Sequence, residues 1–214
     1  MHPSDQHKKV ERTLPKQFDL IAGEVCLDFI NTLDDRFSSE PKELLKSYAD
    51  LIRFAEEADV LDSFYGNQLL AYDEQRPDAG KRALASAVEL RESMFAIFEA
   101  VRKKRHVPYE AMDTLNKFLR AGAENAELVE VKSGFQWEFE TRPLALETPL
   151  WPMARSAANL LTSGNYSFVR TCASETCRWY FLDTSKNHQR RWCDMTKCGN
   201  RAKFQRYYER QKKG

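Results

Sequence analysis

Along most of the chain, hydrophobic residues recur among polar ones with the period of an α-helix. Apolar residues recur at spacings of three and four in several segments, which places them on one face of an amphipathic helix. These segments are residues 25–33, 42–58, 81–104, 109–121 and 150–161. Residues 73–80 contain Pro77 and Gly80 and are expected to separate two of the helices. The pattern predicts a mostly helical body.

Three stretches have the pattern of a β-strand instead. Residues 128–131 and 135–139 alternate on either side of Ser133-Gly134, which is typical of a β-hairpin. Residues 18–23 form a short apolar run that ends at a glycine, and they are expected to be a strand. Together with the helices, these stretches predict an α+β fold: a mostly helical N-terminal domain with a short hairpin.

Four cysteines lie close together near the C-terminal end of the chain: Cys172, Cys177, Cys193 and Cys198. They form two Cys-x4-Cys pairs with fifteen residues between the pairs, a spacing that brings four thiolates to one Zn2+. The alternatives are a disulfide pair and an iron or iron–sulfur site. Residues 1–9 have no apolar segment like that of a secretion signal, so a reducing cytoplasm is expected and disulfides are disfavoured. Cys26 is expected to be a small buried residue.

The segment around these cysteines predicts a small metal-bound module. Residues 178–182 have an aromatic strand pattern, residues 183–187 a turn pattern, and residues 190–192 are expected to form the returning strand. A helix is expected after Cys193, with Asp194 or Thr196 as its N-cap. A cysteine knuckle, a hairpin and a helix that carries the last ligand describe a treble-clef-like finger. Such a unit is too small to fold without its metal, and binding of the metal supplies on the order of 10 kcal/mol of folding free energy.

The charge of the chain is divided between its two parts. Residues 170–214 carry twelve Lys and Arg against four Asp and Glu, a net charge of +8, whereas residues 1–169 carry −7. A basic module with a zinc site is typical of a nucleic-acid binder, and phosphate would repel the acidic part. No apolar run is long enough to cross a bilayer, so no membrane association is predicted.

Basic residues of the module are the candidates for contacts with DNA. At about 100° per residue, one arc of the final helix is basic, and a different arc with Phe204, Tyr207 and Tyr208 is expected to anchor it. Asn200 and Arg201 either contact bases or stabilise the module itself. The candidate set is Arg190, Arg191, Asn200, Arg201, Lys203, Arg206, Arg210 and Lys213. The alternative is a solvated charged face.

Candidate sites in the N-terminal part are fewer. Asp28 and Asn31 lie three residues apart on one helical face and could line a polar ligand pocket, although helix capping and surface ion pairs are the alternative. Trp137 and Trp151 could stack on a ligand or belong to the core. The chain contains no glycine-rich phosphate loop, no Gly-x-Ser-x-Gly and no His-Glu-x-x-His. We therefore expect a protein that is not an enzyme.

Residues 172–203 resemble the CGNR zinc finger, which is named for Cys198-Gly199-Asn200-Arg201. Residues 26–33, 89–92 and 152–161 are similar to the ABATE domain, which precedes this finger in bacterial proteins described as stress-induced transcription regulators. We expect a mobile tail over residues 1–14, an ABATE-like domain over residues 15–166 and the finger over residues 168–214.

These patterns and the resemblance predict a cytoplasmic transcription regulator that binds Zn2+ and DNA through its finger. Its N-terminal domain would sense a small molecule or a protein partner. Because one finger covers only a few base pairs, a homodimer is expected. The alternative is a zinc-stabilised protein-interaction module, or an RNA binder whose Trp179, Tyr180 and Trp192 stack on bases if they are exposed.

Overall fold

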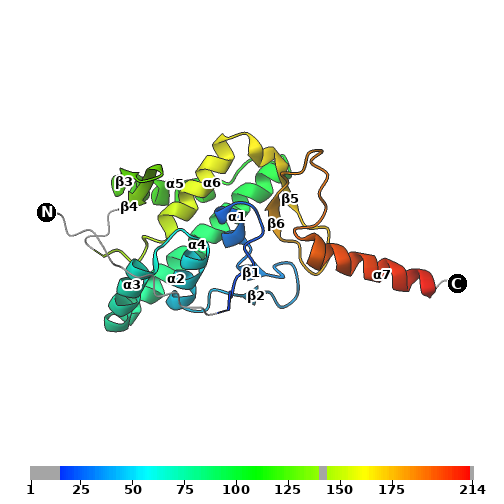
Figure 1. The fold of residues 1–214 in the computed structure, drawn as a ribbon, viewed down its shortest axis with the longest axis horizontal. Coiled ribbons are helices and arrows are strands. Elements are labelled where there is room, and N and C mark those ends of the chain that lie inside the picture. Colours follow the sequence, from blue (N-terminus) through cyan, green and yellow to red (C-terminus); the bar gives the residue numbers. More distant parts are fainter. Residues whose placement is uncertain (1–14, 140–143, 213–214) are drawn as a thin grey trace.

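The computed structural model describes residues 15–139 and 144–212, without the side chains of Arg206, Glu209 and Arg210. The expected tail, residues 1–14, lies outside the described residues. The chain is mostly helical with short antiparallel strand pairs (Figure 1), which confirms the predicted α+β class. The α-helices are α1 (Val25–Ile30), α2 (Tyr48–Glu57), α3 (Ser63–Gln75), α4 (Pro77–Arg102), α5 (Tyr109–Glu124), α6 (Leu150–Thr162) and α7 (Asn200–Gln211).

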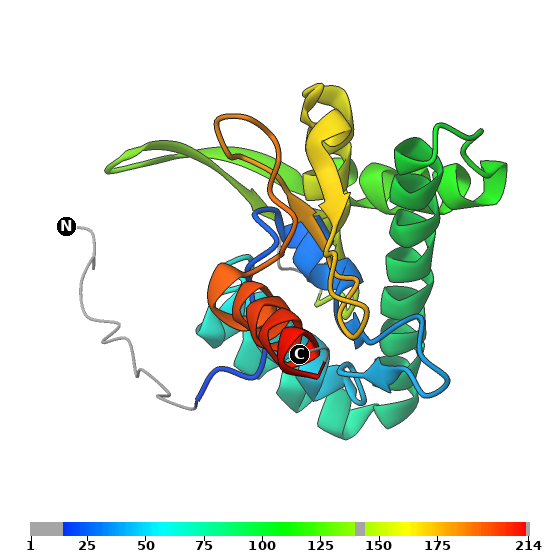
Figure 2. The same cartoon turned by 90° about the vertical axis from the view of Figure 1, so that its right-hand side faces the viewer.

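Helix α4 is the longest helix of the described chain, and α1, α2, α3, α5 and α6 all pack against it. The short helix α1 lies between α4 and α6 and is buried from Cys26 to Ile30. Figure 2 shows α4 as the upright helix beside α1, with α7 directed toward the viewer. Within the described residues, none of the helices has the length and apolar character that a bilayer span requires.

Local capping interactions fix where several helices begin. At the start of α2, the Ser47 amide donates to the Asp50 carboxylate at 2.9 Å, and the Asp50 amide donates to the Ser47 hydroxyl at 3.2 Å. This capping box makes α2 begin later than the pattern over residues 42–58 predicts. Asp62 accepts a bond from the Tyr65 amide at 2.9 Å and caps α3. Pro77 occupies the first turn of α4, where its missing N–H costs nothing.

The expected break between helices lies within residues 73–80, but it is a single residue. Helix α3 continues to Gln75 and α4 begins at Pro77, so only Arg76 divides them and Gly80 lies inside α4. A Cβ atom at Gly80 would lie 1.7 Å from Oδ1 of Asp73, so the glycine allows the end of α3 to approach α4. Helix α3 itself was not predicted.

The predicted strand over residues 18–23 is wrong. This segment is irregular, and side chains satisfy much of its backbone in place of a neighbouring strand. The Phe18 amide donates to Glu57 at 3.0 Å, and the amides of Ile21 and Ala22 each donate to Oδ1 of Asp28 at 2.9 Å. The carbonyl of Ala22 accepts a bond from the Leu182 amide at 2.7 Å. The segment therefore joins the N-terminal part to the C-terminal module.

The predicted hairpin over residues 128–139 is confirmed. Strands β3 (Ala126–Val131) and β4 (Gly134–Phe139) pair antiparallel from Ala126 opposite Phe139 to Val131 opposite Gly134. A second, very short pair joins β1 (Leu33–Asp34) to β2 (Lys42–Glu43).

The C-terminal module (residues 169–212) contains a strand pair whose partner differs from the prediction. Strand β6 (Tyr180–Leu182) pairs antiparallel with β5 (Val169–Thr171), not with residues 190–192, which are irregular. Residues 190–192 instead approach the loop after β5, where the Ala173 amide donates to the Arg191 carbonyl at 2.8 Å. The predicted helix is confirmed as the π-helical turn η2 (Met195–Gly199), capped by Asp194 and followed directly by α7.

One continuous hydrophobic core includes both parts of the chain. It contains Phe29 and Phe98 from the helical body together with Phe181 and Cys172 from the C-terminal module. The module therefore packs against the helical body and is not joined to it by a free tether.

Candidate metal centre and the basic helix

The structure brings the thiols of Cys172, Cys177, Cys193 and Cys198 together. Their four Sγ atoms all lie within 4.8 Å of one another, and all four residues are buried. Sγ of Cys193 lies 3.6 Å from Sγ of Cys177 and 3.7 Å from Sγ of Cys198. Cys26 is also buried but is not part of this cluster, as expected.

These separations fit a single tetrahedral ion. With a zinc–sulfur bond of about 2.3 Å, the sulfurs of a tetrahedral site lie roughly 3.8 Å apart. A disulfide would require about 2.05 Å, and all five cysteines of the chain are free thiols. The donor set and its spacing therefore support zinc bound by these four residues.

The chemistry of the cluster also favours a divalent cation at its centre. Hydrogen bonding to Cys172 is the main cause that raises the pKa of Cys177 and Cys193, and burial adds to it. Four thiolates cannot occupy this volume together without a positive charge among them, because their repulsion has no solvent to screen it. A bound Zn2+ would supply that charge.

Backbone hydrogen bonds hold the loops that carry the cysteines. The Cys172 amide donates to the Trp179 carbonyl at 2.8 Å, and the Cys177 amide to the Ser174 carbonyl at 3.1 Å. Oδ1 of Asp194 accepts bonds from the amides of Thr196 and Lys197 at 2.6 and 3.1 Å. These contacts fix the turn from which Cys198 projects into the cluster.

Gly199 follows the last cysteine because a side chain does not fit there. A Cβ atom at this position would lie 2.8 Å from Cδ1 of Trp192, closer than real Cβ contacts allow. The glycine thus lets the indole of Trp192 cover the turn.

Arg190 is bound inside the C-terminal module. Its Nε donates to the Trp192 carbonyl at 2.8 Å, a second nitrogen donates to the Cys193 carbonyl, and the guanidinium lies 4.9 Å from the centre of the Phe181 ring. Asn200 similarly donates to the Thr196 carbonyl at 2.9 Å. Both side chains stabilise the metal loops through these contacts.

The other described basic candidates lie at the surface. Arg191 is exposed, with its guanidinium 4.5 Å from the centre of the Trp192 ring, and Lys203 is exposed on α7. Arg201 is exposed and donates to Oγ1 of Thr176 at 2.7 Å. The side chains of Arg206 and Arg210, and all of Lys213, lie outside the described residues.

The aromatic face of α7 differs from the prediction. Phe204, Tyr207 and Tyr208 were expected to anchor the helix, but they are 65%, 59% and 62% exposed. Figures 1 and 2 show α7 extending away from the rest of the described chain, and these three aromatic side chains remain exposed. By contrast, Tyr180 and Trp192 are buried and Trp179 is partly buried, and they offer no open rings for stacking on bases.

Asp28 and Asn31 lie at the junction between the two parts of the chain. Asn31 donates to the Tyr180 carbonyl and accepts from the Tyr180 amide, both at 2.9 Å, and Asp28 holds the irregular segment before α1. Asn31 also borders a cavity of only about 10 Å³. Their polar atoms bind backbone groups, and a ligand role for them stays a prediction.

Sequence reasoning missed two kinds of residue. Asp34 accepts a bond from Nε1 of Trp179 at 2.7 Å, and Lys197 forms an ion pair with Asp19 at 2.5 Å, so both pairs join the module to the body. Arg155 lies against two aromatic rings at the β3–β4 hairpin. No local pattern marks such residues, because their partners are distant in sequence.

Comparison with known proteins gives two matches in succession along the chain. Residues 23–164 match the family ABATE, described as "Putative stress-induced transcription regulator". Residues 169–211 match the CGNR zinc finger. No curated protein matches the chain.

Proposed function

This chain belongs to the ABATE family and carries a CGNR zinc finger, and we propose that it is a transcription regulator that binds DNA. In this proposal the zinc finger holds α7 against the DNA, and the ABATE domain senses a small molecule or a partner. The protein acts in the cytoplasm, where its thiols stay reduced.

The projecting helix α7 is the observation that carries the proposal. It begins at Asn200, two residues after the metal ligand Cys198, so the metal site fixes the direction in which α7 leaves the body. Its twelve residues span about 18 Å, and the major groove of B-DNA admits a helix of that kind. Arg201 and Lys203 are exposed on α7, and Arg191 is exposed beside it.

Charge supports the same surface. The twelve Lys and Arg of residues 170–214 outnumber the four Asp and Glu. Because the rest of the chain is acidic, phosphate would be attracted to the finger and repelled by the body. Among the described basic residues of α7, the exposed side chains form no ion pair with the body, and Lys197, in the turn before α7, pairs with Asp19.

The second candidate is a protein-interaction module, and one observation favours it. Phe204, Tyr207 and Tyr208 form an exposed aromatic surface on α7, and aromatic residues are enriched where proteins bind one another. This surface suits a second copy of the chain, which would also double the DNA contacts. The variant in which the basic helix docks on the chain's own acidic body has less support, because the described side chains of α7 are almost all exposed.

The test is a titration of zinc-loaded, full-length protein with labelled duplex DNA at increasing salt, followed by fluorescence anisotropy. We expect the logarithm of the binding constant to fall linearly with the logarithm of salt concentration. Lys203→Gln removes a contact to phosphate. It is expected to weaken binding several-fold and to reduce the slope by about 0.9.

The matched control is Lys132→Gln, which removes an exposed lysine at the β3–β4 turn. It is expected to change neither the affinity nor the slope. Binding that does not respond to salt, or an equal loss of affinity in the two variants, contradicts the DNA proposal. Concentration-dependent self-association without DNA binding favours the interaction module.

A further inference from the structure

A large cavity lies between the β3–β4 hairpin and helices α5 and α6. Its volume is about 490 Å³, within the range of pockets that hold small organic ligands. Carbon atoms form most of its wall, from Leu119, Gly122, Trp137, Phe139 and Trp151. The wall would bury the apolar body of a ligand.

The indole of Trp151 forms part of this apolar wall. The residue is only 6% exposed, and its Nε1 has no hydrogen-bond partner within the described residues. Because Nε1 itself is buried, the ring contributes carbon atoms to the wall.

Arg155 brings a positive charge to the same wall. Its guanidinium lies 5.4 Å from the centre of the Trp137 ring and 5.2 Å from that of Phe139. Burial lowers the pKa of this guanidinium, and no carboxylate pairs with it among the described residues. A partly buried cation without a counter-ion attracts an anionic group.

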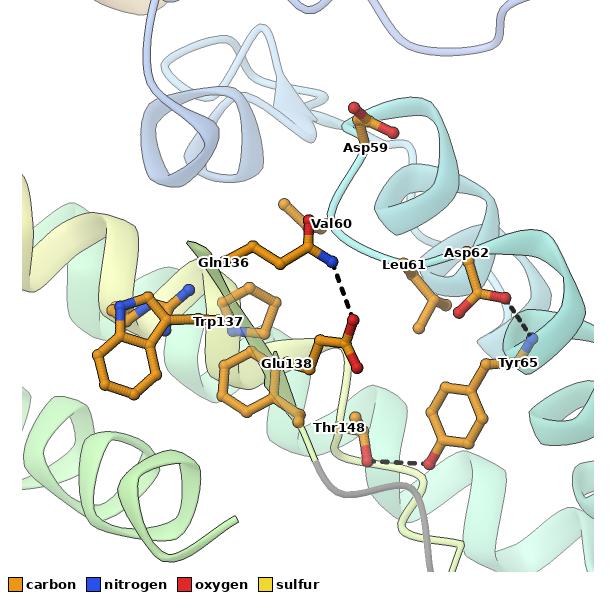
Figure 3. A pocket seen from close by; sticks show the side chains of 12 residues that line it. Asp59, Val60, Leu61, Asp62, Tyr65, Gln136, Trp137, Glu138 and Thr148 are labelled. Carbon is orange, nitrogen blue, oxygen red and sulfur yellow. Dashed lines mark hydrogen bonds between the residues drawn. The ribbon is translucent and has the colours of Figure 1, made fainter. Parts of the chain in front are cut away.

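The cavity on the other side of β4 has a different character. Figure 3 shows this second cavity, of about 500 Å³, with Gln136 and Glu138 joined at 2.9 Å and Tyr65 and Thr148 joined at 3.3 Å. It shares Trp137, Phe139 and Arg155 with the apolar cavity, but Asp59, Asp62 and Glu138 line it too, whereas no described carboxylate lines the apolar cavity. The polar groups of the second cavity largely bond to one another, and its carboxylates would repel an anion. The apolar cavity is thus the better site for an anionic ligand.

We infer that the cavity between the hairpin, α5 and α6 binds an organic carboxylate with an aromatic or aliphatic body. The body lies between Trp137, Phe139 and Trp151, and the carboxylate pairs with Arg155. If the ABATE domain senses a small molecule, an organic carboxylate is the class of ligand that it senses. To that extent the inference rests on the proposed function.

Isothermal titration calorimetry of the full-length, zinc-loaded protein tests the inference without DNA. The probes are phenylacetate, naphthalene-1-acetate and decanoate, each compared with its neutral amide. We expect at least one carboxylate to bind with a dissociation constant below about 100 µM, and its amide to bind about tenfold more weakly, because only the acid pairs with Arg155.

Three variants locate the site. Arg155→Gln is expected to abolish the preference for the acid over the amide, and Arg82→Gln, which removes an exposed arginine from α4, is expected to retain it. Ala123→Phe fills the cavity from an exposed position on α5 and is expected to abolish binding of both probes. Circular dichroism confirms that each variant is folded.

The inference is overturned if no carboxylate binds, if acid and amide bind equally, or if Ala123→Phe binds as the unchanged protein does. Because the measurement contains no DNA, these outcomes are independent of whether the finger binds a duplex. Loss of DNA binding with carboxylate binding intact would contradict the proposed function alone.

Discussion

The buried environment of Asp28 perturbs its carboxyl group. Burial raises its pKa to about 6, and the hydrogen bonds from the amides of Ala22 and Ile21 offset this only in part. An ordinary aspartate has a pKa near 4. The folded protein therefore holds a proton on Asp28 over a pH range in which the unfolded chain has already lost it.

This difference predicts a pH dependence of stability. Between about pH 4 and pH 6 the folded state binds more protons at Asp28 than the unfolded state, so the free energy of unfolding falls as pH rises, by up to about 3 kcal/mol. Asp28→Asn removes this contribution while an amide oxygen still accepts from the backbone. Urea denaturation from pH 4 to pH 7 measures the free energy of unfolding of both proteins. Any effect of pH on zinc binding is common to the two proteins and cancels in the difference between them.

We expect the Asn variant to gain stability relative to the original protein as pH rises through this range. Parallel stability curves would show that Asp28 titrates normally. Such a result would also contradict the description of its carboxyl group as desolvated.

The paired strands β1 and β2 illustrate how a short element depends on a distant side chain. Each strand has two residues, too few to be stable alone. The buried guanidinium of Arg91, on α4, makes two bonds of 2.7 Å to Glu43 and one of 3.2 Å to Oγ1 of Thr32. Arg91 therefore holds β2 and the end of α1 against α4.

Replacing Arg91 with Met is expected to destabilise the protein by about 3 kcal/mol, because it leaves Glu43 without its counter-charge. The side chain of Glu43 is 34% exposed and can be hydrated in the variant. The expected loss of stability is therefore at the low end of the range for buried ion pairs that lose one partner. Chemical denaturation measures the change. Lys81→Gln, in a pair whose partners are 78% and 83% exposed, is the control and is expected to have almost no effect.

The helices were predictable to the extent that each has a broad apolar face. Helices α4, α5 and α6 agree with the sequence pattern to within a few residues at either end. Helix α3 was missed because its fully buried residues are only Tyr65, Gly66 and Leu69, a stripe too narrow to give a strong period. The segment over residues 18–23 resembled a strand because apolar content does not reveal that Asp28 and Glu57 satisfy its backbone.

The continuous core makes the zinc finger and the ABATE domain depend on each other. Phe181 and Tyr180 of the finger are buried in the core that contains α1 and α4, and Asn31 bonds both backbone groups of Tyr180. Loss of the metal should therefore disturb the whole molecule. The same contacts provide a physical route by which a ligand in the ABATE domain could bias α7.

Removal of zinc with a chelator is expected to lower the unfolding temperature of the entire chain by at least about 10 °C, in a single transition. Differential scanning calorimetry with and without chelator measures this. The Cys193→Ser variant is expected to unfold at the lower temperature whether or not chelator is present. The Cys26→Ala variant is expected to retain zinc and to show the same decrease in unfolding temperature on chelation as the original protein. A transition that persists at its original temperature after zinc removal would contradict the shared core.

The metal site, the helical class and the hairpin β3–β4 could be read from the amino-acid sequence. These depend on local properties: the spacing of Cys172, Cys177, Cys193 and Cys198, the period of apolar residues, and the turn at Ser133-Gly134. Three features became visible in the folded chain alone: β6 pairs with β5, Arg190 and Asn31 bind backbone groups, and the aromatic face of α7 is exposed. The physical reason is that spacing constrains residues close in sequence, whereas pairing and exposure depend on which distant surfaces meet.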